Sequence, residues 1–158
     1  MTSKTSVRPV TRTDMPALKD IVDASGLFPS DMLDAMIAGY FNNEPDSGFW
    51  LIADAEDPVG LAFCAPEQMT EGTWNLYLIA VHPTRHGRGI GSALIRHIET
   101  ILAGQGVRIL LVETSGLPGF DRTRRFYRHC GYEEEARIRD FYQAGEDKIV
   151  FRKAISAM

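Results

Sequence analysis

Three glycines at alternate positions, set among basic side chains, form the part of this sequence best suited to bind an anion. They are Gly87, Gly89 and Gly91 in the run HGRGIGS. Glycine has no Cβ, so the backbone can curl with its N–H groups turned inward and a ligand can approach closely. A helical pattern begins at Ile90, and a helix N-terminus adds unpaired N–H groups and the positive end of its dipole. The segment predicts a phosphate or pyrophosphate site, made of His86, Gly87, Arg88, Gly89, Ile90, Gly91 and Ser92.

Two other interpretations of this glycine segment compete with an anion site. One is a turn that only tightens a strand-to-helix connection, which the nearby basic side chains disfavour. The other is a dinucleotide fingerprint, because residues 87–92 nearly fit G-x-G-x-x-G/A and Glu113 follows where a ribose-binding carboxylate is expected. That fingerprint follows its strand almost directly, whereas five residues separate Val81 from Gly87. The chain is also too short on either side for a doubly wound nucleotide domain.

The glycine segment joins a predicted strand to a predicted helix, and a second strand follows. Residues 73–81 form the first strand, and the helix runs from Ile90 to about Gly104. Residues 107–112 are almost wholly apolar, which predicts a central strand buried on both faces. A right-handed crossover connects the two strands and makes them parallel.

The remaining segments show helix and strand patterns around this unit. A short strand and two helices come first, a hairpin follows them, and a basic helix and a second hairpin end the chain. These predicted elements are strand 7–10, helices 14–26 and 30–39, strands 49–53 and 59–65, helix 120–129, and strands 132–138 and 148–153. No linker or repeat divides them, so residues 1–158 are expected to form one α+β domain.

Composition and charge narrow the classes of function. Hydrophobic and charged residues make up 44% and 24% of the chain, as in an ordinary globular domain, and the net charge is −4. A chain with net negative charge is not attracted as a whole to nucleic acid or an anionic membrane, so neither is expected as a partner. The absence of an apolar signal segment, and two cysteines that read as free thiols, predict a cytoplasmic protein. The four histidines show no metal-binding spacing, so no metal is expected.

Two motifs resemble those of a known enzyme family. Residues 81–91, VHPTRHGRGIG, resemble the acyl-CoA signature of the GNAT superfamily of N-acetyltransferases, usually written Q/R-x-x-G-x-G/A. Residues 126–132, FYRHCGY, are similar to the family's F-Y-x-x-x-G-F/Y. The order of the predicted strands and helices also matches the GNAT layout along the chain. Two positions depart from the pattern, since His86 stands where the family usually has Gln or Arg, and Phe120 where it often has Asn.

The resemblance implies a fold and a cosubstrate. The fold is a mixed, mostly antiparallel sheet of six to seven strands, with helices on both faces and a splay between two central parallel strands. The splay would hold the pantetheine arm of acetyl-CoA, the acyl donor, and the glycine segment would hold its pyrophosphate. A neutral His86 donates one hydrogen bond to phosphate and a charged one donates two, so CoA binding is expected to depend on pH.

The resemblance also implies roles for single residues. It puts the Tyr127 hydroxyl near the CoA sulfur, where a phenol can protonate the thiolate that leaves when an amine attacks the thioester. The backbone of Val81 is implied to bind the acetyl carbonyl. Glu113 is the candidate base for the amine because it lies at a strand end beside the splay, where ligands bind, and Tyr77 is a weaker candidate. A solvated charge at the strand end is an equally favoured interpretation of Glu113. Without the resemblance, Tyr127 is interpreted as a core aromatic.

Two charged clusters near the C-terminus each have two interpretations. The arginines on the helix of Tyr127 form a solvated face, or one of them reaches a CoA phosphate. The acidic residues of the final hairpin attract a cationic amine, or they only aid solubility. The arginines are Arg122, Arg124, Arg125 and Arg128.

These features predict an N-acetyltransferase that moves an acetyl group from acetyl-CoA to a primary amine by direct attack. The acceptor is a small-molecule amine or a peptide or protein amine, and the sequence does not distinguish among them. Dimers are common among proteins of this kind, so a homodimer is one expected state. The rival functions are a catalytically silent acyl-CoA-binding regulator and, less favoured, an NAD-binding domain.

Overall fold

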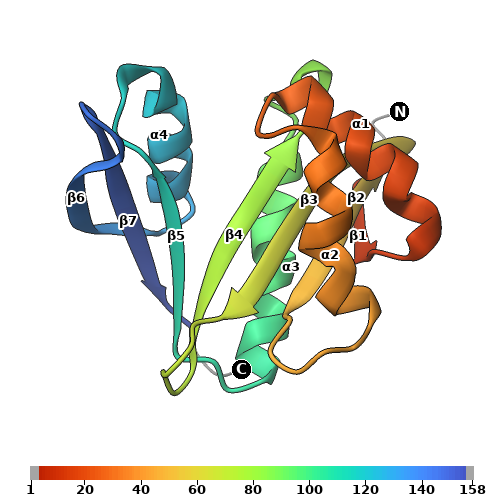
Figure 1. The fold of residues 1–158 in the computed structure, drawn as a ribbon, viewed down its shortest axis with the longest axis horizontal. Helices are drawn as coiled ribbons and strands as arrows, with labels where there is room; N and C mark the ends of the chain where they lie inside the picture. The colour runs from red at the N-terminus through yellow and green to blue at the C-terminus, as the bar shows by residue number, and fades with distance from the viewer. Residues whose placement is uncertain (1–3, 156–158) are drawn as a thin grey trace.

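The computed structural model describes residues 4–155, whose strands form one seven-stranded sheet with helices on both faces (Figure 1). The strands are β1 (Ser6–Pro9), β2 (Phe49–Ala55), β3 (Asp57–Pro66), β4 (Thr73–Val81), β5 (Ile109–Ser115), β6 (Glu133–Gln143) and β7 (Glu146–Ala154). The helices are α1 (Met15–Ser25), α2 (Leu33–Phe41), α3 (Ile90–Gly104) and α4 (Asp121–His129). The strand order is β1-β2-β3-β4-β5-β7-β6, and among these described strands only the β4–β5 pair is parallel. The predicted mixed α+β fold is confirmed.

The helices cover opposite faces of the sheet because each turns an apolar stripe toward it. On one face α1 and α2 enclose a core that includes Leu18 and Trp50. On the other face α3 and α4 enclose a core that includes Leu94, Tyr127 and Phe151. In Figure 1, α1 and α2 lie in front of the sheet and α3 lies behind it. Within residues 4–155, none of the helices is long and apolar enough to cross a membrane.

β4 and β5 pair at one end and then diverge. Their parallel ladder runs from Thr73 with Ile109 to Leu76 with Val112, and within the described residues it stops there. Figure 1 shows the two strands close together at that end and separating toward the other. The backbone polar groups on the β5 side of residues 77–81 therefore have no strand partner. The splay implied by the GNAT resemblance is confirmed.

A bulge at Tyr77 changes which side chains of β4 face each helical layer. Residues 63–64 of β3 pair with Leu78 and Leu76, so Tyr77 is the extra residue on β4. Leu76 packs in the core of α3 and α4, whereas Leu78 packs in the core of α1 and α2. After the bulge, Ile79 consequently packs on the α3–α4 side.

The prediction that β5 is buried on both faces was wrong. β5 begins at Ile109 rather than at residue 107, and its side chains alternate. Leu110 and Val112 are buried, but Leu111 and Glu113 are only half-buried. The reason is that α1 and α2 pack on β2, β3 and β4 rather than on β5. One face of β5 therefore stays partly open beside the splay.

Other boundaries also differ from the sequence prediction. Only Glu56, with a φ of +72°, separates β2 from β3, so this turn is tighter than predicted. Residues 30–32 form a 3-10 turn, and α2 continues past Gly39 to Phe41. The final hairpin is longer than predicted, because only residues 144–145 separate β6 from β7.

Candidate functional site

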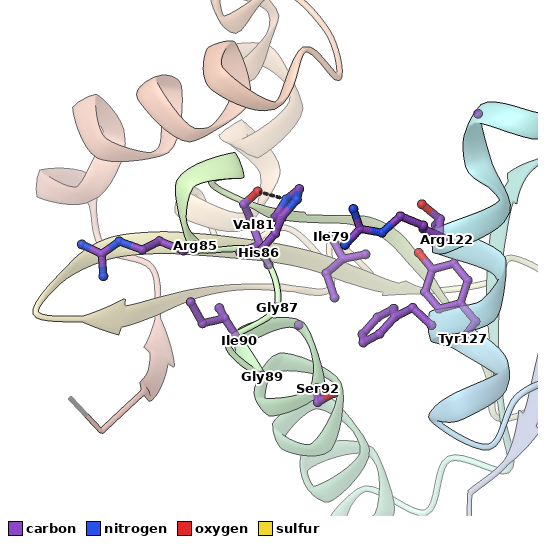
Figure 2. Close-up of a pocket in the computed structure, with 14 residues that line it drawn as sticks. Ile79, Val81, Arg85, His86, Gly87, Gly89, Ile90, Ser92, Arg122 and Tyr127 are labelled. Carbon is purple, nitrogen blue, oxygen red and sulfur yellow. Dashed lines mark hydrogen bonds between the residues drawn. The ribbon is translucent and has the colours of Figure 1, made fainter. Parts of the chain in front are cut away.

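A cavity of about 580 Å³ lies where β4, the start of α3 and α4 meet (Figure 2). Ile79 and Val81 line it from β4, and Phe126 and Tyr127 line it from α4. The residues of the predicted anion site that line it are His86, Gly87, Gly89, Ile90, Gly91 and Ser92. The splay thus brings together the glycine segment and Tyr127, which are far apart in the sequence.

The glycines of this segment meet two different physical requirements. Gly87 and Gly89 both have a φ of +78°, which is the left-handed conformation that glycine adopts without strain. A Cβ at either position would contact nothing within 4 Å, so space for a ligand remains beside both. At Gly91, by contrast, a Cβ would lie 3.0 Å from Cζ of Phe126, so Gly91 lets α3 and α4 pack closely.

The start of α3 offers backbone donors to an anion. Gly89 is the N-cap of α3 and provides no side-chain cap. The N–H groups in the first turn of a helix have no partner within it, and here they belong to Ile90, Gly91 and Ser92. All three residues line the cavity. A phosphate at this point would meet backbone donors and the positive end of the helix dipole.

His86 is bound to the backbone of β4. Its Nε2 lies 2.9 Å from the carbonyl oxygen of Val81, a contact drawn in Figure 2. A carbonyl only accepts, so Nε2 carries the hydrogen, and a neutral imidazole then has no N–H left to donate. In this conformation only a charged His86 can also donate to a phosphate.

The other two basic side chains of the segment have different positions. Arg85 lines the cavity, but it donates from Nη1 to the carbonyl of Ala55 at 3.1 Å and pairs with Asp57 at 3.5 Å. Figure 2 shows its guanidinium directed away from Tyr127. Arg88 is exposed and is not among the residues that line the cavity. At the glycine segment, the partial positive charge that faces an anion therefore comes mainly from backbone N–H groups.

Tyr127 lies at the α4 wall of the cavity. Its side chain is only 4% exposed and packs against the rings of Phe151 and Tyr132. Burial raises the pKa of its phenol above the usual value, so the hydroxyl keeps its proton at neutral pH. Among the described residues, none forms a hydrogen bond with this hydroxyl, which leaves it free for a ligand.

Of the α4 arginines, Arg122 is the one that lines the cavity. Figure 2 shows it extending from α4 into the space between Tyr127 and Ile79, and it has no partner among the described residues. Arg124 instead donates to the carbonyls of Ser115 and Leu117, at 2.7 and 2.9 Å. Arg125 and Arg128 pair with Asp121 and Glu134. Arg122 is therefore the only one of the four free to reach a ligand phosphate.

Glu113 lies outside the cavity, on the α1–α2 face of the splay. Its neighbour Val112 packs in the α3–α4 core, so Glu113 points to the opposite face. Its Oε1 accepts from Lys148 Nζ at 3.3 Å, and its Oε2 accepts from Asn75 Nδ2 at 3.2 Å. The Tyr77 hydroxyl lies on the same face.

Within residues 4–155, no group of acidic, histidine or cysteine side chains is arranged to hold a metal ion.

Sequence reasoning missed three residues that line the cavity. Ile79 was missed because strand alternation from Leu76, without the bulge at Tyr77, places Ile79 on the opposite face of the sheet. Gly119 lies in the turn before α4 and carries no local signal. Thr123 lies one helical turn before Tyr127, so spacing along α4 could have identified it.

The sequence profile of the acetyltransferase (GNAT) family matches residues 15–132, which is most of the chain. The chain therefore belongs to the GNAT acetyltransferase family. A search among curated proteins finds no match.

Solved structures of the same family have this fold. A GNAT-family protein from Desulfovibrio desulfuricans is 32% identical, with a TM-score of 0.89 over 97% of this chain and 100% of that one. The ribosomal-protein-S18-alanine N-acetyltransferase from Escherichia coli is 21% identical, with a TM-score of 0.78 over 98% of this chain and 96% of its own. The yncA protein of Salmonella typhimurium, solved with its cofactor acetyl-CoA, is 13% identical. Its TM-score is 0.73 over 98% of this chain and 95% of its own.

Proposed function

We propose that residues 1–158 form a single-domain N-acetyltransferase that moves an acetyl group from acetyl-CoA to a primary amine. The observation that carries this proposal is one cavity with an anion-binding helix start at one end and the Tyr127 hydroxyl at the other. Membership of the GNAT family supports the reaction class.

The residues around the cavity fit acetyl-CoA. The open space beside Gly87 and Gly89 and the first-turn N–H groups of α3 suit the pyrophosphate. Arg122 is free to contribute a guanidinium to a phosphate. On the β4 side, the unpaired backbone between residues 77 and 81 offers donors and acceptors to the amide groups of the pantetheine arm. The same edge includes Val81, the proposed partner of the acetyl carbonyl.

Bound acetyl-CoA supplies a thioester that an amine can attack. The Tyr127 hydroxyl would donate its proton to the leaving sulfur, because burial keeps that proton in place at neutral pH. Glu113 is the proposed acceptor for the proton of the amine, and it acts from the opposite face of the splay. This arrangement lets the two proton transfers occur on different sides of the reacting carbon.

The acceptor would approach between α1–α2 and β6–β7, opposite the cavity that takes acetyl-CoA. Figure 1 shows these elements on either side of the diverging β4 and β5. A small-molecule amine and an amine of a peptide or protein both fit the proposal. The E. coli relative acts on a ribosomal protein, which supports a protein acceptor as one candidate.

The proposal is tested by thiol release from acetyl-CoA across a panel of small amines and peptides with free N-termini. We expect release that depends on both the amine and the enzyme, with no release when the same amine is supplied already acetylated. Acetyl-CoA binding without release by any acceptor would instead indicate a regulatory acyl-CoA-binding protein. Failure to bind acetyl-CoA would overturn the proposal.

A further inference from the structure

Two carboxylates lie close together on the α1–α2 face of the splay, and only one is paired with a cation. Glu113 forms an ion pair with Lys148 at 3.3 Å. Glu67 accepts at Oε1 from the Tyr77 hydroxyl at 2.7 Å and from Asn75 Nδ2 at 2.9 Å. Both donors to Glu67 are neutral, and within residues 4–155 no cation pairs with it. This cluster therefore carries one negative charge without a partner.

Asn75 joins the two carboxylates and lacks a partner of its own. It is only 2% exposed, and its Nδ2 donates to both Glu67 and Glu113. The opposite amide orientation would turn the oxygen against two carboxylates, so Nδ2 is the atom that faces them. Its buried Oδ1 has no hydrogen-bond partner among the described residues. Buried acceptors without a donor are uncommon, and an N–H group that entered the cluster would supply one.

Three exposed aromatic side chains lie near this pair of carboxylates, Tyr77 against Glu67 and Phe141 with Tyr142 beside Lys148. Tyr77, Phe141 and Tyr142 are 50%, 51% and 46% exposed. Lys148 Nζ lies 3.8 Å from the ring centroid of Phe141 while it pairs with Glu113. This face thus already binds one ammonium group, its own lysine, with a carboxylate and an aromatic ring. Glu67 beside Tyr77 offers the same two kinds of group to a second ammonium.

An ammonium group that pairs with Glu67 is not the nitrogen that reacts. Glu67 and Glu113 accept from the same Asn75 Nδ2, so the two carboxylates lie side by side. A nitrogen held by Glu67 as an ammonium is protonated and has no lone pair, so it does not attack the thioester. The attacking nitrogen is therefore a second, neutral amine, which an alkyl chain joins to the ammonium.

We propose that Glu67 binds a second, non-reacting ammonium group of the acceptor, so that the preferred acceptor is an alkyl diamine rather than a monoamine. The proposal rests on the acetyltransferase function proposed above. Asn75 accepts a hydrogen bond from that ammonium through Oδ1, and Tyr77 covers it with its ring. Glu113 stays paired with Lys148 and available to the reacting amine.

The test compares cadaverine and putrescine with pentylamine and butylamine, which have the same chains and one ammonium group. Both kcat/KM with acetyl-CoA and calorimetric Kd with the CoA complex are measured. Since a hydrogen bond to a charged group strengthens binding by about tenfold or more, we expect each diamine to be favoured about tenfold or more in both measurements. In Glu67→Gln, which keeps the acceptor for Tyr77 and Asn75, the diamine preference should disappear.

Glu71→Gln is the matched control, because it removes the same charge from the same loop. Glu71 is exposed, and its carboxylate has no partner among the described residues. This variant should keep the diamine preference. Equal use and equal binding of the two amine classes by the wild type would overturn the proposal, as would a preference that survives Glu67→Gln. Either result is compatible with the acetyltransferase function. Absence of thiol release with every amine, monoamines included, would contradict that function.

Discussion

Tyr127 combines two properties at one atom, a retained proton and a free hydroxyl. Burial among Phe151 and Tyr132 raises the pKa of its phenol, so the group stays protonated well above neutral pH. Within the described part of the chain, no other group binds the hydroxyl. A general acid for a thiolate leaving group needs both properties.

We predict that Tyr127→Phe lowers kcat about a hundredfold, which is typical for the loss of a general acid. The Kd for acetyl-CoA should change little, because the ring that lines the cavity is kept. Steady-state kinetics and calorimetry measure the two quantities on the same preparation.

Tyr40→Phe is the control for loss of a tyrosine hydroxyl, since Tyr40 donates to the carbonyl of Val10 far from the cavity. It should leave kcat unchanged. If Tyr127→Phe also leaves kcat unchanged, Tyr127 takes no part in proton transfer.

At the scale of elements, α3 and α4 meet where Gly91 contacts Phe126. Glycine inside a helix normally destabilises it relative to alanine by about 0.5–1 kcal/mol. Here a Cβ would lie 3.0 Å from Cζ of Phe126, and overpacking of this kind costs about 1–3 kcal/mol. Alanine at position 91 would therefore gain helix propensity but overpack against Phe126. We expect the overpacking to have the larger effect on stability.

We therefore predict that Gly91→Ala lowers the free energy of unfolding by about 1 kcal/mol. A double-mutant cycle with Phe126→Leu, measured by urea denaturation, should show that the smaller side chain relieves most of this loss. A Gly91→Ala variant more stable than the wild type would show that α3 and α4 do not restrict this position.

Hydrogen bonds to Asp14, the N-cap of α1, link β1 to the start of that helix. Asp14 accepts from both terminal nitrogens of Arg8 at 2.8 Å and from the backbone N–H of Thr11 at 2.7 Å. The side-chain hydrogen bonds from Arg8 lower the pKa of Asp14 from 3.8 to about 2. Since the unfolded chain binds this proton more tightly, the stabilisation is complete above about pH 4 and is lost as the pH falls toward 2.

Asp14→Asn should therefore lower the free energy of unfolding by about 1–2 kcal/mol at pH 7, a value reduced for the 42% exposure of Arg8. The difference from the wild type should shrink as the pH falls from 4 to 2, as measured by denaturation at each pH. Asp34→Asn, which breaks an exposed pair with Lys19, should have little effect. A difference that persists at pH 2 would contradict the role of the Asp14 charge.

For the whole molecule, the sequence predicted what local patterns encode. The strand, glycine segment and helix from residue 73 to 104 were predicted because their periodicity and turn residues are local. The parallel pairing of β4 with β5 followed from the crossover rule and is confirmed. The bulge at Tyr77 was not predictable, since alternation along β4 carries no sign of the extra residue.

Long-range contacts of side chains were the other part that the sequence could not supply. The bond from His86 to the Val81 carbonyl depends on how the segment folds back on its strand. The cluster of Glu67, Asn75 and Glu113 joins three segments that meet only in the folded sheet. Motif spacing indicated the cavity, but only the structure shows which charges around it are already paired.

The most direct test of the proposed function is a calorimetric titration of the purified protein with acetyl-CoA and, separately, with NAD. We expect acetyl-CoA to bind and NAD not to bind. Gly89→Val should weaken acetyl-CoA binding about tenfold, because a β-branched residue is strained at a φ of +78°. Absence of acetyl-CoA binding, or tight binding of NAD in its place, would contradict the proposed function.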